Sequence, residues 1–138
     1  MSIVTLLETV VHEHSRHLRK SKKVRLEPLD SSSAKILEHY VRKLKNLSQK
    51  LGTTLHSIAQ YNLKELDQES LAKLDLLTFF IYEVATTEEI EFWSRLETYR
   101  KSLTGIEIAI DKEIERVSKI KDLAKYINMH VQSLLKEA

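Results

Sequence analysis

Three histidines near the start of the chain are the first residues whose types and spacing suggest chemistry. His12, His14 and His17 lie close together, and Glu13 stands between the first two. Helical zinc sites pair histidines four residues apart, on one helix face, but the residue four positions after His12 is Arg16. His14 and His17 are suitably spaced to share an ion, yet the sequence offers no third ligand at a diagnostic spacing. We therefore predict no metal site, and interpret the histidines as the flank of a basic helix end.

Catalytic and cofactor motifs are missing from the sequence. It has no cysteine, no glycine-rich phosphate loop and no nucleophile elbow. Glu88 and Glu89 follow Thr86 closely and are typical of a helix's first turn, where acidic side chains interact favourably with the dipole. The sequence thus predicts a protein without enzymatic activity, cofactor or small-molecule substrate. The lack of cysteine suits a reducing compartment, so we expect a cytoplasmic protein.

Positive charge gathers in the first part of the chain. Residues 12–50 contain eleven Lys and Arg against four acidic residues, a local charge of +7 in a chain of total charge +2. Cations that neutralise phosphates release counterions, so such a cluster is typical of a nucleic-acid backbone contact. Cations at a helix end are also favoured by the helix dipole alone, which is the competing interpretation. The predicted nucleic-acid contacts are Arg16, Arg19, Lys20, Lys22, Lys23, Arg25, Arg42, Lys43 and Lys45.

Hydrophobic periodicity predicts helices along most of the chain. The first spans residues 3–20, behind Ser2 as N-cap, with His14 on its apolar stripe. A loop containing Pro28 follows over residues 21–32, with a short extended piece conceivable near Val24. A second helix ends at Gly52, read as a left-handed C-cap. Further helices are predicted over residues 54–66 and 67–84, the latter starting at Asp67.

The last part of the chain reads as helical too. A capping box formed by Thr86 and Glu89 predicts a helix start, and Gly105 predicts a break or bend. The final helix is expected to have about thirty residues, roughly 45 Å, and so to overhang the bundle. The prediction is an all-α, single-domain bundle of five or six helices with a long C-terminal helix. Its basic N-terminal part is 1–52, its apolar central helices lie in 54–84 and its C-terminal helices in 87–136.

Apolar positions also suggest a protein partner or self-association. The helix over residues 67–84 is apolar on most of its circumference, and the expected overhang needs a partner. The aromatic residues there lie outside the basic region, so nucleic-acid contact would be directed to the backbone. The apolar stretch 74–85 is too short to cross a membrane. The predicted protein interface comprises Phe79, Phe80, Trp93, Tyr99, Val131 and Leu135.

Residues 34–83 resemble the helical domain of GINS replication-complex subunits. The resemblance lies in the helix pattern of residues 40–47, YVRKLKNL, a break at Gly52, and an acidic-capped helix beginning DQESL at Asp67. It implies a non-enzymatic scaffold that links a helicase to other replication proteins. The family also implies a small β-rich domain, whereas residues 86–138 are predicted to be helical.

Size, helicity and basic charge are also similar to those of the small helical subunits that line the nucleic-acid channel of CRISPR effector complexes. Two functions are therefore expected. The first is an adaptor or scaffold subunit of a larger assembly, with nucleic-acid-associated assemblies of the replication type included. The alternative is a small basic module that binds nucleic-acid backbone without sequence specificity.

Overall fold

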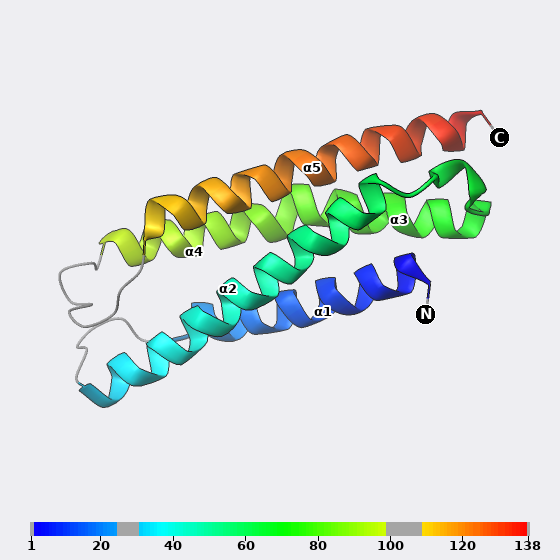
Figure 1. Ribbon diagram of the computed structural model, residues 1–138. Coiled ribbons are helices and arrows are strands. Elements are labelled where there is room, and N and C mark those ends of the chain that lie inside the picture. The colour runs from blue at the N-terminus through cyan, green and yellow to red at the C-terminus, as the bar shows by residue number, and fades with distance from the viewer. Residues whose placement is uncertain (1, 25–30, 99–108, 138) are drawn as a thin grey trace.

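The computed structural model describes residues 2–24, 31–98 and 109–137, and these are helical almost throughout, with no strand among them. The predicted all-α class with a long C-terminal helix is therefore confirmed (Figure 1). The elements are α1 (Ile3–Lys22), α2 (Ser31–Ala59), the 3₁₀ turn η1 (Leu63–Glu65), α3 (Gln68–Phe80), the π-helical turn η2 (Ile81–Ala85), α4 (Thr86–Thr98) and α5 (Ile110–Lys136).

Two of the predicted helix starts are confirmed, and each has a side-chain N-cap. The Ser2 hydroxyl accepts a hydrogen bond from the Thr5 backbone N–H at 3.1 Å, and Asp67 Oδ1 accepts one from the Ser70 N–H at 2.8 Å. Each cap satisfies an N–H group that has no partner inside the helix. The bond from Ser70 also lowers the pKa of Asp67, because it stabilises the ionised carboxylate.

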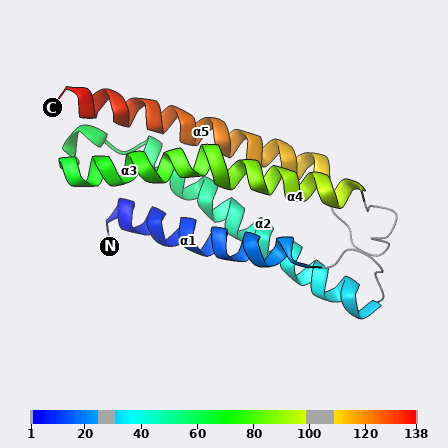
Figure 2. The same cartoon turned by 180° about the vertical axis from the view of Figure 1, so that it is seen from behind.

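The helices form two antiparallel hairpins that pack side by side. α1 packs on α2, while α3, η2 and α4 line up along α5 (Figures 1 and 2). The hairpins meet where α2 packs on α5 and α1 packs on α3, and each of these pairs runs in the same direction. The beginning of α1 and the end of α5 lie at one end of the bundle, and the end of α1 and the beginning of α2 lie at the other.

The predicted helix end at Gly52 is wrong, because α2 continues to Ala59. A Cβ atom at Gly52 would lie 3.2 Å from Ile120 Cγ1 and 3.3 Å from Ile120 Cδ1. The missing side chain therefore lets α5 approach α2 closely. The separate helix predicted over residues 54–66 is instead the end of α2 followed by the η1 turn.

The predicted capping box at Thr86 is also wrong. α3, η2 and α4 follow one another without a break, and the Thr86 N–H and hydroxyl both donate to the Ile81 carbonyl, the hydroxyl at 2.9 Å. This bond to the fifth preceding residue defines the π-helical turn. Thr86 is thus a buried residue inside a helix, and Glu89 points into the protein.

The predicted overhang of the last helix is absent. α5 has 27 residues and packs along α3, η2 and α4, a comparably long rod, for much of its length. Gly105, Pro28 and the predicted contact Arg25 lie outside the described residues. The argument for self-association that depended on an unpaired helix end therefore falls away.

The buried apolar side chains form two clusters along the bundle. One surrounds Leu7, Leu55, Leu74 and Ile127, toward the chain ends. The other surrounds Leu18, Leu44, Trp93 and Val117, toward the α1–α2 connection. Between the two clusters lie the buried polar residues His14 on α1, Ser48 on α2 and Glu89 on α4, so a polar layer divides the core.

Candidate functional site

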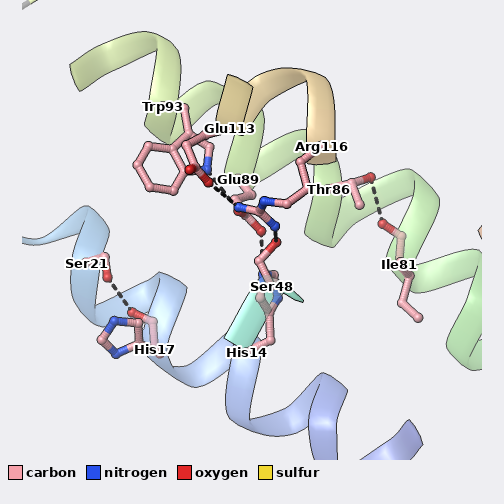
Figure 3. A network of polar contacts seen from close by, with 10 residues as sticks. All are labelled: His14, His17, Ser21, Ser48, Ile81, Thr86, Glu89, Trp93, Glu113 and Arg116. Carbon is pink, nitrogen blue, oxygen red and sulfur yellow. Dashed lines mark hydrogen bonds and ion pairs between the residues drawn. The ribbon is translucent and has the colours of Figure 1, made fainter. Parts of the chain in front are cut away.

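The polar layer takes one buried or half-buried side chain from each rod: His14 from α1, Ser48 from α2, Glu89 from α4 and Arg116 from α5 (Figure 3). His14 and Glu89 are 0% and 1% exposed. Buried polar groups are stable only when they are paired, so each of these side chains should have a partner. The polar layer therefore has to supply a hydrogen-bond or ion-pair partner for each of these side chains.

Glu89 is the centre of the layer. Its Oε1 lies 2.6 Å from His14 Nε2, and its Oε2 accepts a hydrogen bond from Trp93 Nε1 at 2.9 Å. Arg116 Nη2 lies 3.8 Å from the same Oε2. A carboxylate only accepts hydrogen bonds, so His14 donates from Nε2 and the indole donates from Nε1. Both oxygens of a fully buried carboxylate are therefore satisfied.

Arg116 extends the polar layer from Glu89 to Ser48 on α2 and Glu113 on α5. Its Nη1 donates to Ser48 Oγ at 2.6 Å, and its Nη2 donates to Glu113. Lys45 Nζ lies 3.4 Å from the other oxygen of Glu113. Two carboxylates and two cations thus balance in charge, which offsets part of the cost of removing them from water.

The layer lacks the features of a catalytic or metal centre. Among the described residues no group of three or more His, Asp or Glu side chains could hold a metal ion. Glu89 and His14 are closed off from solvent, so a substrate cannot reach either side chain. The remaining ring atom, His14 Nδ1, has no hydrogen-bond partner there. The arrangement is suited to fixing the helices against one another, not to chemistry.

His17 makes a second buried polar contact, between α1 and α2. Its Nε2 lies 2.8 Å from the Tyr40 carbonyl oxygen, and its ring stacks on the Tyr40 ring with centroids 5.3 Å apart. Burial lowers the pKa of His17; the bond to Tyr40 opposes this, while Lys43, His39 and His14 lower it further. The effect of Lys43 shows that positive charge from α2 reaches the α1 surface.

Most of the predicted nucleic-acid contacts lie together. The antiparallel α1–α2 hairpin brings the second half of α1 beside the first half of α2 (Figure 1). We use the term basic face for those of the predicted contacts at this place that are exposed and have no carboxylate within 4.0 Å among the described residues. The basic face consists of Arg16, Arg19, Lys20, Lys23 and Lys43.

The other predicted cations are paired with acidic side chains. Arg42 Nη2 donates to Glu38 Oε1 at 2.6 Å, and Lys22 Nζ lies 3.4 Å from Glu88. Lys45 faces Glu113 in the polar layer. These ion pairs reduce the charge that the three cations present to a ligand, so the basic face is narrower than the sequence predicted.

A hollow of about 420 Å³ lies between the end of α1 and the beginning of α2. Tyr40 lines it, although the sequence placed the aromatic residues outside the basic region. Sequence reasoning missed Tyr40 because only the closed α1–α2 hairpin brings its ring beside the lysines of α1. The lining residues are Lys20, Lys23, Val24, Ser33, Ile36 and Tyr40.

The predicted protein interface is largely dispersed or buried. Trp93 and Val131 are both 0% exposed within the chain, so their assignment to a partner surface is wrong. Phe80 and Leu135 are half-buried and pack against the first apolar cluster. Phe79 alone is substantially exposed, at 49%, whereas Tyr99 lies outside the described residues.

None of the described helices is long and apolar enough to cross a membrane. No family model, curated protein or solved structure matches the chain. The resemblance to GINS subunits therefore remains a prediction, and the glycine-marked break that contributed to it lies inside α2.

Proposed function

We propose that this protein is a non-enzymatic helical module that binds the sugar-phosphate backbone of nucleic acid through the basic face. The observation that carries the proposal is the convergence, on two neighbouring helices, of five cations that have no carboxylate partner among the described residues. Such cations keep their charge for an external ligand, and each one that neutralises a phosphate releases a counterion. A regular polyanion suits this surface better than an isolated acidic residue would.

The charge of the rest of the molecule supports the proposal. The rod formed by α3, η2 and α4 carries seven acidic residues against Lys73 and Arg95. An anionic polymer is repelled by this rod and attracted to the basic face, so it approaches the bundle in one orientation. Contacts to phosphates carry no sequence information, so we expect weak sequence specificity.

The test is charge reversal at the basic face. The substitutions Arg19→Glu, Lys20→Glu, Lys23→Glu and Lys43→Glu should abolish binding to random DNA and RNA measured by fluorescence anisotropy. For the unmodified protein, affinity should fall steeply between about 50 and 300 mM salt. Affinity that survives the fourfold reversal would overturn the proposal.

A matched control keeps the net charge of that variant but moves the substitutions elsewhere. Lys64, Lys112, Lys125 and Lys136 are exposed and have no ion-pair partner among the described residues. Their replacement by Glu should reduce affinity only modestly, because distant charges are screened by salt. An equal loss in both variants would indicate a general charge effect and would contradict a defined binding face.

A second candidate function, a protein adaptor, is favoured by one observation. Leu76 and Phe79 lie three residues apart on α3 and are 70% and 49% exposed, and Phe79 makes an edge contact with Tyr82. Side chains at this spacing are neighbours on one helix face. The double substitution Leu76→Ser and Phe79→Ser should abolish any self-association seen by sedimentation. A monomer at high concentration before substitution would argue against self-association as the adaptor mechanism.

A further inference from the structure

The hollow beside the basic face combines two kinds of lining. Val24, Ile36 and Tyr40 supply apolar surface, and Lys20 and Lys23 supply positive charge. Ile36 is 52% exposed although it lies on a helix whose other large apolar residues are mostly buried. Exposed apolar surface surrounded by cations is unfavourable to leave in water and attractive to a ligand that is itself both flat and anionic.

Tyr40 is held in place at this hollow. Its ring stacks on His17 at an interplanar angle of 18°, and His39 meets it edge-on with centroids 6.2 Å apart. The His17 bond to the Tyr40 carbonyl fixes the backbone at the same point. An aromatic side chain that is already ordered loses little conformational entropy when a ligand stacks against it.

We propose that the hollow receives an unpaired nucleobase, so that the protein prefers single-stranded over double-stranded nucleic acid. The base stacks on apolar surface formed by Tyr40 and Ile36, while Lys20 and Lys23 contact the flanking phosphates. Paired bases are stacked inside a duplex and cannot enter, whereas unpaired bases stack readily on aromatic side chains. This inference rests on the proposed function, since the basic face supplies the backbone contacts that bring the base to the hollow.

The experiment compares anisotropy binding of fluorescein-labelled oligothymidylate and oligouridylate of about 15 nucleotides with binding of the corresponding duplexes. Tyr40→Leu retains an apolar side chain but removes the ring, and Ile36→Ala removes an exposed side chain. Each should weaken single-strand binding roughly tenfold and leave duplex binding unchanged. Tyr126→Leu, the same change at an exposed tyrosine on α5, serves as the control and should alter neither.

The outcomes separate this inference from the proposed function. Equal affinity for single strands and duplexes overturns the nucleobase site while leaving backbone binding intact. The same conclusion follows if the two variants lose as much affinity for duplexes as for single strands. Absence of binding to any of the oligonucleotides overturns both. Circular dichroism of Tyr40→Leu establishes whether the variant is folded, and Ile36→Ala provides the independent reading if it is not.

Discussion

The side chains of His14 and Glu89, 75 residues apart in the sequence, meet at 2.6 Å between Nε2 and Oε1 in the interior of the bundle. The contact joins α1 to α4 and so ties one helical hairpin to the other. Because both side chains are almost completely buried, neither has water as an alternative partner. The pair therefore distinguishes the native packing of the hairpins from arrangements that would separate the two groups.

Removal of the Glu89 carboxylate should destabilise the protein strongly. Glu89→Ala leaves His14 and Trp93 without their shared acceptor and Arg116 without one of its two carboxylate partners. Loss of one partner from a buried pair costs about 3–5 kcal/mol. Urea unfolding followed by Trp93 fluorescence gives the free energy of unfolding. Glu91→Ala, an exposed acid-to-alanine change on the same helix, should alter it by about 0.5 kcal/mol or less. Similar values for the two variants would show that the layer contributes little to stability.

Substitution of Gly52 by alanine should be unfavourable despite its better helix propensity. The new Cβ would crowd Ile120, and overpacking costs about 1–3 kcal/mol, against a helix-propensity gain of about 1 kcal/mol. We expect a net loss of about 1 kcal/mol in thermal or urea unfolding. In an Ile120→Ala background, which lacks both the Cγ1 and the Cδ1 atom, the same substitution should become neutral or stabilising. A gain in the unmodified background would mean that Ile120 moves aside freely.

His17 should make stability depend on pH. Its pKa is below the ordinary value of 6.5, chiefly because of burial, so the unfolded chain binds the proton more readily than the folded protein. Its contribution is therefore fully present above pH 6.5 and is lost as pH falls from there through the lowered pKa. His17→Gln should therefore reduce the loss of unfolding free energy between pH 7.5 and 5.5. An unaltered pH dependence would exclude His17 as its source.

Lys43, a residue of the basic face, should influence the pKa of His17. Its positive charge lowers the pKa of His17, so Lys43→Gln should raise that pKa, as measured by NMR titration of the imidazole. A bound polyanion at the basic face should raise it too, because the phosphates neutralise the same charge. Lys125→Gln, on the far hairpin, is the control. A His17 pKa that is insensitive to Lys43 would contradict the proximity of the two side chains.

Local chemistry was sufficient to predict some elements of the fold. The caps at Ser2 and Asp67 depend on side chains within three residues of the bonds they make. Gly52 and Thr86 were misinterpreted because tertiary packing overrides the local tendency of each residue: Ile120 requires the glycine, and the interior accommodates Thr86 inside a π-helical turn. Helix propensity and capping motifs are weak guides wherever a helix is packed on several sides.

The site was predictable only in part. The sequential run of cations from Arg16 to Lys23 is visible in any reading of the chain, whereas the pairing of Lys22 with Glu88 needs the folded bundle. A histidine on an apolar helical stripe, His14, was a signal that a buried polar partner must exist. Periodicity identifies the face on which such a residue lies, but it does not identify Glu89 as that partner.

The beginning of α1 and the end of α5 lie at one end of the bundle, and this has a practical consequence. A fluorescent protein, affinity handle or surface tether joined to either terminus would sit at the opposite end from the lysines of α1 and the beginning of α2. Immobilised molecules would then all present those lysines outward, accessible to a passing strand. Single-molecule measurements on such an array would report how nucleic acid binds to these lysines without interference from the tether.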